Sequence, residues 1–231
     1  GATLKTGNIT AADDVSDLDN MNITNGTVKA AGDAEIKNVT LDNGLLQAVA
    51  TTGDTPAGGD ITIDGDLSGQ GAVVADKTLT LTNGYTGTEG DDLTLQADTL
   101  DTEGAINSIT GDLTIAATNL VTANDAATTL KDDTLVADNV ALGDALTASG
   151  ASLVQVQDFG TYSDVDSTFT SGALDQAVSV QDTSLMAYGA DLAQAQQAVA
   201  ETGHTGAAYY AGKTLTQYPN FNYLFLFHNF C

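Results

Sequence analysis

Apolar and polar residues alternate in one short phrase that recurs between residues 60 and 142. The phrase is Asp-Ile-Thr-Ile at 60–63, Thr-Leu-Thr-Leu at 78–81, Asp-Leu-Thr-Leu at 92–95 and Asp-Leu-Thr-Ile at 112–115, with a degenerate copy from Thr134. Successive side chains of a β-strand point to opposite faces of the sheet. The alternation therefore predicts a stack of similar strands, with isoleucine and leucine on the inner face and threonine on the outer face.

A second apolar residue follows seven or eight residues after each phrase begins, at Leu67, Tyr85, Leu100 and Leu120, and it predicts another inward strand after a turn. The phrases begin 18, 14 and 20 residues apart. A unit of this length buries its apolar face only against neighbouring units, so the pattern favours a mainly β fold of the parallel β-solenoid (β-helix) type. An antiparallel β-sandwich is the alternative, but it gives no reason for the same phrase to recur with the same polarity.

Short strands are also predicted on both sides of this central stretch. Asn-Ile-Thr occurs at 8–10 and 22–24 between clusters of Asp, Asn and Gly, and alternating strands are predicted at 151–157 and 177–181. Residues 1–190 are therefore predicted to form one β-solenoid.

The segment 191–203 has a different pattern. It is rich in Ala and Gln, it places Leu192, Ala195 and Val199 on one helical face, and it ends at Gly203. This spacing predicts a short helix that caps the stack or links it to the C-terminal segment. Capping is the favoured role, because an exposed strand edge invites uncontrolled pairing.

Residues 204–231 contain most of the aromatic residues of the chain. Eight of thirteen lie after residue 208, and the segment 219–231 predicts a strand that is apolar on both faces. Such a strand must be buried on both faces, either as a central or capping strand of its own fold or as a strand added to a neighbouring copy. The candidate assembly residues are Phe221, Tyr223, Leu224, Phe225, Leu226, Phe227 and Phe230.

The charge of the chain excludes several classes of partner. There are 31 acidic residues against six lysines and no arginine, giving a net charge of −25, which argues against binding to nucleic acid or to anionic membranes. Of the acids, 27 are Asp and four are Glu, as expected for a chain with many turns. The apolar run at 223–227 is too short to span a membrane. The start at Gly1 without a signal peptide indicates a mature or excised segment.

Candidate sites are few, and they belong to the surface. Asn8, Asn22, Asn25 and Asn38 each begin an Asn-x-Thr sequon, although Asn beside Thr-rich strands also arises from composition. Acid pairs at 64/66, 91/92 and 132/133 are candidates for calcium at predicted turns, with solvated turns as the default interpretation.

The sequence shows no catalytic, cofactor or transition-metal site. The two histidines, His204 and His228, lie in unlike contexts and lack the spacing of metal ligands. The single cysteine, Cys231, excludes an intrachain disulfide, so it either pairs between chains or marks the end of the segment.

Two stretches carry a family resemblance. Asp-Asp-Leu-Thr-Leu-Gln-Ala-Asp-Thr-Leu-Asp at 91–101 and Gly-Asp-Leu-Thr-Ile-Ala-Ala-Thr-Asn-Leu-Val at 111–121 resemble the repeats of filamentous haemagglutinin-type adhesins and other secreted β-helical surface proteins of bacteria. The likeness covers residues 55–145. It implies a right-handed β-helix outside the cell that works as a stalk, fibre or adhesin, and it carries over no functional residue.

These observations together predict a non-enzymatic, extracellular structural protein of the cell surface. We expect copies of the chain to join head to tail through their ends and the C-terminal aromatic strand, with host or matrix glycans as possible further partners. The alternative function is a carbohydrate-binding or carbohydrate-cleaving protein on the same fold, in which two acidic residues would do the chemistry.

Overall fold

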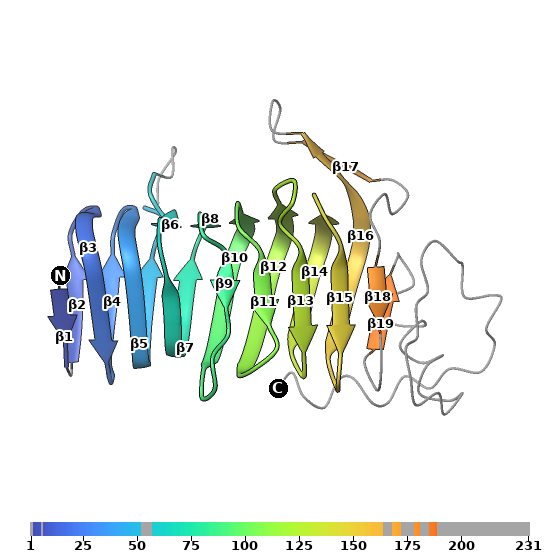
Figure 1. The fold of residues 1–231 in the computed structure, drawn as a ribbon. Helices are drawn as coiled ribbons and strands as arrows, with labels where there is room; N and C mark the ends of the chain where they lie inside the picture. The colour runs from blue at the N-terminus through green and yellow to red at the C-terminus, as the bar shows by residue number, and fades with distance from the viewer. Residues whose placement is uncertain are drawn as a thin grey trace, which may run out of the picture.

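The computed structural model describes residues 2–5, 7–51, 57–163, 168–171, 178–180 and 185–188. In these residues the chain forms strands that lie side by side along one axis, from β1 near the N-terminus to β18 and β19 (Figure 1). Every strand pair among them is parallel except β16 with β17, and no helix occurs among them. The predicted parallel β-solenoid is therefore confirmed, and the antiparallel sandwich is excluded for this part of the chain.

Each coil of the solenoid passes over three faces in the order 1, 2, 3. Face 1 contains three whole strands, β2 (Gly7–Ala11), β4 (Gly26–Ala30) and β19 (Leu185–Tyr188). It also contains the last parts of β5 (Ala34–Ala48) and β7 (Leu67–Ala75). The first parts of β10 (Asp92–Thr102), β12 (Asp112–Thr122), β14 (Thr134–Ala141) and β16 (Leu153–Ser163) complete the face. Face 2 contains the first parts of β3 (Val15–Thr24) and β5, β6 (Ile61–Ile63), β8 (Thr78–Leu81) and the second parts of β10, β12, β14 and β16.

Face 3 contains β1 (Ala2–Leu4), the remaining parts of β3, β5 and β7, and a separate sheet of β9 (Tyr85–Thr86), β11 (Ile106–Ser108), β13 (Thr128–Lys131), β15 (Leu146–Ser149) and β18 (Val178–Val180). The short β17 (Thr168–Ser171) pairs with the end of β16 and stands out from the stack (Figure 1).

The core consists of columns of inward side chains that continue from coil to coil. On face 1 one column is fully or almost fully buried in every coil from β4 to β16, and its members are Val28, Leu46, Val73, Leu95, Ile115, Leu135 and Val154. Burying a side chain of this size stabilises the fold by roughly 1.5–3 kcal/mol. The column is the main reason why one coil needs the next.

A second inner column on face 1 is made mostly of alanine. Ala11, Ala30, Ala48 and Ala75 are paired in series, and Ala97, Ala117 and Ala137 form another series further along the stack. These residues stand just before the bend from face 1 to face 2. The column is not restricted to alanine, because Val156 pairs with Ala137 and is fully buried.

The inner and outer assignments of the recurring phrase are confirmed. Every isoleucine and leucine of the phrase is at most 1% exposed, whereas the intervening threonines are half-buried on the outside. The second apolar residues, Leu67, Tyr85, Leu100 and Leu120, are also buried. The alternating strands predicted at 151–157 and 177–181 correspond to β16 and β18.

The stacking of consecutive phrases was predicted wrongly in one place. The phrases at 60 and 78 stack on each other on face 2, but Leu79 of the second phrase pairs with Leu100 rather than with Leu93. The phrases at 92 and 112 lie instead on face 1. The 14-residue interval is therefore a step between two faces and not the length of a coil. Alternation shows which side of a strand is inside but does not show which face the strand belongs to.

Paired residues show that most coils are 18 to 22 residues long. The two limits are given by Thr128 paired with Leu146 and by Ile106 paired with Thr128. Two coils are longer: Ala48 pairs with Ala75 across the segment after β5, and Leu146 pairs with Val178 across the segment that contains β17. At Gly69 two coils approach closely: its φ is +100°, and a Cβ there would overlap the carbonyl oxygen of Leu41. Only glycine combines that conformation with that contact.

The predicted helix at 191–203 and the predicted aromatic strand at 204–231 lie outside the described residues. The proposed division of the chain at 190 is therefore still a prediction. Among the described residues, none belongs to a helix long and apolar enough to cross a membrane.

Candidate functional site

Aspartates at the corner between faces 1 and 2 hold successive coils together. Asp14 Oδ1 accepts a hydrogen bond from the backbone N–H of Asp33 at 2.8 Å, and Asp33 Oδ1 accepts one from Asp60 at 3.0 Å. Asp60 Oδ1 in turn accepts one from Thr78 at 2.8 Å. Each carboxylate therefore satisfies the first N–H of the following coil, much as an Asx side chain caps a turn.

The same corner continues as an amide ladder in the later coils. Asn139 Nδ2 donates to Asn119 Oδ1 at 2.9 Å, and Asn119 Nδ2 donates to Thr99 Oγ1 at 3.3 Å. These side chains are half-buried, and they satisfy one another along the stack. The corner therefore has a structural role in the described coils, because its side chains connect each coil to the next.

Asp91 was a calcium candidate together with its neighbour Asp92. The structure places its carboxylate inside the corner between faces 3 and 1, 7% exposed, with hydrogen bonds from Gly69 N (3.1 Å), Thr88 N and Oγ1 (both 3.0 Å) and Tyr85 Oη (3.3 Å). Burial, and then the nearby negative charge of Asp91, raise the pKa of the Tyr85 hydroxyl above its usual range. Four donors saturate the Asp91 carboxylate, so it closes the turn. Asp92 is exposed on the outside.

Asp133 is the most unusual acid of the described residues. It stands one residue before the partner of Thr114, at the inward position that Leu113 occupies in the preceding coil, and it is 2% exposed. Its two carboxylate oxygens accept hydrogen bonds from Leu113 N at 2.7 Å and Lys131 N at 2.8 Å. Burial raises the pKa of Asp133 and outweighs these two N–H groups, which lower it.

Two of the remaining calcium candidates, Asp132 and Asp64, accept hydrogen bonds at turns. Asp132 Oδ1 accepts a hydrogen bond from Ala151 N at 2.8 Å, and Asp64 Oδ1 accepts one from Thr82 Oγ1 at 3.2 Å. Within the described ranges, no three acidic, histidine or cysteine side chains lie close enough together to hold a metal ion. The three acid pairs that the sequence singled out thus lie at turns without forming an ion cage in this part of the chain.

The four sequon asparagines all lie in the first coils. Asn8 and Asn22 are exposed on strands, and Asn25 is exposed at a turn with φ of +47°. Asn38 differs, because its Nδ2 donates to the carbonyl of Asp19 (3.1 Å) and to the side chain of Asn20 (3.0 Å). A glycan fits the outer surface at the first three positions, whereas at Asn38 it would displace two hydrogen bonds. Glycosylation stays a prediction.

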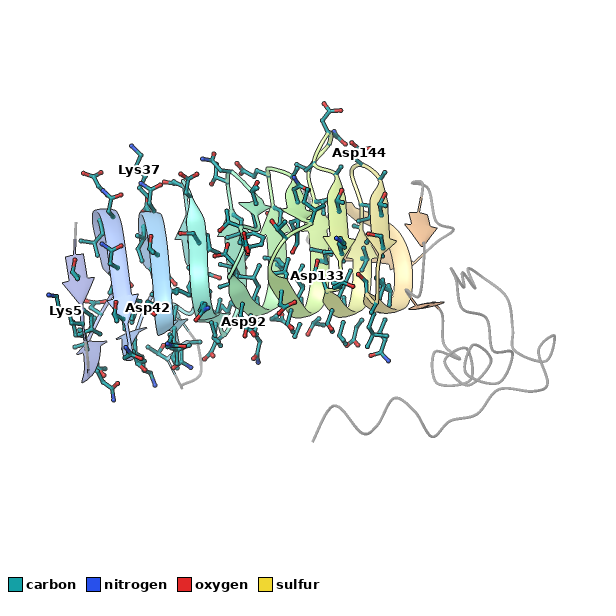
Figure 2. All side chains as sticks on the ribbon, turned by 60° about the horizontal axis from the view of Figure 1, so that its bottom comes forward. Lys5, Lys37, Asp42, Asp92, Asp133 and Asp144 are labelled. Carbon is teal, nitrogen blue, oxygen red and sulfur yellow. The ribbon has the colours of Figure 1, made fainter. Side chains whose placement is uncertain are left out.

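One shallow hollow lies beside the irregularity between Val15 and Leu18 in β3. Its volume is about 440 Å³, and its lining residues are Leu18, Asp19, Glu35, Ile36, Lys37 and Asp64. It is open to solvent, and its lining combines three carboxylates with one ammonium group, so its net charge is negative. Figure 2 shows Lys37 on the outer edge of the stack.

The other residues singled out by the sequence lie outside the described residues. They are His204, His228, Cys231 and the aromatic assembly candidates Phe221, Tyr223, Leu224, Phe225, Leu226, Phe227 and Phe230. Sequence reasoning missed the buried role of Asp91 and Asp133. Each stands two residues before an inward leucine, Leu93 or Leu135, so strand parity places it on the inward side, but the backbone N–H groups of Gly69 and Leu113 that bind the two carboxylates come from the preceding coil.

Comparison of this chain with protein-family models, with curated proteins and with solved structures finds no match.

Proposed function

We propose that this chain is a non-enzymatic structural subunit or segment of an extracellular surface fibre or adhesin, and that copies join head to tail through their ends and the C-terminal aromatic strand. The observation that supports the proposal best is the uninterrupted parallel stack, in which each coil adds about 4.8 Å of length along one axis. Such a stack is suited to work as a spacer or rod.

The use of the polar side chains supports a structural role. The buried carboxylates of Asp91 and Asp133 and the corner column from Asp14 to Asp60 bind backbone N–H groups of their own or neighbouring coils. Asp91 and Asp133 accept hydrogen bonds at both carboxylate oxygens, and the corner aspartates accept one at Oδ1, so all of these acids take part in holding the backbone. The acids therefore stabilise coils and keep the outside soluble.

The test compares the full chain with two double variants of the predicted aromatic strand. Phe225→Asp with Phe227→Asp introduces charge at apolar positions, and Asn220→Asp with Asn222→Asp introduces the same charge at polar positions of the same strand. Light scattering and negative-stain electron microscopy should show fibres for the full chain and the Asn control, and soluble monomers for the Phe variant.

Two results would contradict the proposal. If the full chain remains monomeric at high concentration, copies do not join and the fibre proposal fails. If a panel of glycans shows turnover, the chain is an enzyme and the alternative of a carbohydrate-cleaving β-helix takes its place. Circular dichroism of each variant checks that the loss of fibres does not result from a loss of fold.

A further inference from the structure

The outer side of face 1 carries a strip without charge, which we call the neutral strip. It consists of the outward side chains within six strand segments, and those segments contain no Asp, Glu or Lys: 44–48, 71–75, 93–97, 113–117, 134–137 and 153–156. Half-buried aliphatic residues alternate there with threonine and glutamine. The aliphatic members are Leu45, Ala72, Val74, Ala116, Val136 and Leu153.

Carboxylates border the neutral strip on both sides. At the corner with face 3, Asp42, Asp92 and Asp112 stand in one column that also includes Gln70, and all three acids are exposed. Figure 2 shows Asp42 and Asp92 along the same edge of the stack. At the opposite edge, the exposed aspartates Asp76, Asp98 and Asp138 stand directly after three of the strip segments. A neutral surface between two acidic rows favours an occupant that brings no negative charge of its own.

Outward positions differ between the faces. On face 2 the outward column includes Glu35 and Asp101, and on face 1 Lys29 stands one coil before the strip, beside Gln47. The outward column of face 3 also lacks charge, but it consists of hydroxyl and amide side chains, as at Asn107, Thr129 and Thr147. The neutral strip is distinguished because it combines the lack of charge with partly exposed aliphatic surface.

The size of the neutral strip fits a short segment of chain. Five strand intervals of about 4.8 Å and five residues of about 3.3 Å give a strip of roughly 24 by 17 Å, or on the order of 400 Å². A standard interface buries about 800 Å² on each partner, so the strip is too small for a whole folded partner. An extended segment of about seven residues has the length of the strip.

The chain contains one segment with the matching chemistry. Residues 202–231 have no aspartate or glutamate, one lysine and eight aromatic residues, whereas the part before them carries all 31 acids. Two copies of this chain repel each other through their carboxylates, and the acid-free segment is the part that can approach the acidic borders of the strip with the least repulsion. Its aromatic rings offer large apolar faces that pack against the aliphatic and threonine side chains of the strip.

We infer that the neutral strip is the docking site for the acid-free C-terminal segment, residues 202–231, of a second copy of this chain. The inference rests on the proposed function, because it names the contact through which copies would join. A segment of one copy on the strip of the next is a heterologous contact that does not close on itself, so repetition extends a fibre.

The single cysteine makes this contact directly measurable, because Cys231 ends the proposed docking segment. A photoreactive maleimide on Cys231 of the full chain, irradiated in a mixture of isotopically heavy and light copies, attaches residue 231 to whatever lies beside it. Digestion before aspartate and mass spectrometry then give the attachment site. We expect heavy-to-light links to residues of the six strip segments.

Three other results separate the two proposals. Links from Cys231 to β1 or β2 of another copy would refute the strip and leave head-to-tail joining intact. Links to the strip only within one copy would refute the second copy as the occupant. If the full chain does not associate and yields no heavy-to-light link, both proposals fail together.

A pair of variants tests the strip independently of the label. Ala116→Glu with Val136→Glu places two carboxylates on the strip in adjacent coils, and Thr129→Glu with Thr147→Glu places two on the outer side of face 3 in the same arrangement. The strip variant should raise the concentration needed for assembly about tenfold or more, and the face 3 control should leave it nearly unchanged. An equal effect of both pairs would refute the strip, because it would show repulsion without a specific site. Circular dichroism confirms that both variants keep the fold of the unmodified chain.

Discussion

Two threonines in adjacent coils allow the cost of an unsatisfied hydroxyl to be measured. Thr102 and Thr122 pair with each other in one inner column and are 0% and 5% exposed. Thr122 Oγ1 accepts a hydrogen bond from Gly143 N at 2.9 Å, whereas Thr102 Oγ1 is buried with no hydrogen-bond partner in the described residues. The same substitution in the two coils should therefore have opposite effects.

Thr102→Val keeps the shape of the side chain and removes the hydroxyl that has no partner. Because an unsatisfied buried polar group costs about 1–3 kcal/mol, the free energy of unfolding should rise by about that amount. Thr122→Val leaves the N–H of Gly143 without an acceptor, so the free energy of unfolding should fall by about 1–3 kcal/mol. Thr128→Val repeats the first test on face 3, since Thr128 is 1% exposed and also has no partner in the described residues.

Thermal and urea unfolding followed by circular dichroism measure these changes. For a chain of this size, 1 kcal/mol corresponds to a shift of about 2–4 °C in Tm, which is well resolved. We expect Tm to rise for Thr102→Val and Thr128→Val and to fall for Thr122→Val. If Thr102→Val and Thr122→Val shift Tm in the same direction and by similar amounts, burial of the hydroxyl decides stability and its hydrogen bonding does not, and the reasoning is refuted.

Two further predictions concern the core and its buried acid. Ile115→Ala removes a fully buried member of the face 1 column and should lower the free energy of unfolding by about 2–5 kcal/mol, whereas Ile109→Ala, at a side chain that is 48% exposed, should change it by less than about 0.5 kcal/mol in the same urea titration. The raised pKa of Asp133 means that its contribution to stability is fully present below the unfolded pKa and is lost as pH rises through the folded pKa. The stability of the unmodified chain relative to Asp133→Asn should therefore decline from pH 4 towards neutrality, and a difference that does not change with pH would contradict the assignment; titration of the other acids is common to both chains and cancels.

The sequence predicted the strands and their inner sides because both follow from local alternation. Leu93 and Leu95 are inside and Thr94 is outside, and two-residue periodicity needs no knowledge of the rest of the fold. Assignment of strands to faces was harder, since the phrases at 78 and 92 look alike but lie on different faces. That information depends on the length of the turns, and the alternation does not contain it.

The spacing of the inner alanines contained information on the coil length that the recurring phrase did not show. Ala30 and Ala48, and later Ala117 and Ala137, recur at intervals of one coil, so they mark the true repeat length even where the phrase does not. The column changes to Val156 in the next coil, so alanine marks the repeat only up to Ala137. Within that range the alanine spacing gives the coil length that the phrase spacing does not.

The inner acids were not predictable from residue type. An aspartate before an apolar strand reads as a solvated turn, as Asp112 is, but Asp133 in the next coil is buried beside Leu113. The difference arises because Asp133 takes the hydrogen bond of Leu113 N across coils, and a contact between residues 20 positions apart is invisible to local patterns. Long-range hydrogen bonding decided the role of this side chain.

The outer columns of a solenoid carry information that its inner columns cannot. Most inner positions are apolar in successive coils, because each coil forms the core for the next, and the exceptions such as Thr102 and Asp133 are buried polar residues, so regularity of the inner columns says mainly that the chain folds. Outer residues have no such restriction, as Glu35 and Thr62 show by pairing at one outward position. A property that persists through many outer positions therefore has to be compared between faces before it is given a function. The outward column of face 3 also lacks charge but is polar, as at Asn107 and Thr129, whereas the neutral strip adds aliphatic side chains such as Leu45 and Val136. It is this combination that the proposed docking of the acid-free segment uses, and the two pairs of glutamate variants on faces 1 and 3 separate it from charge alone.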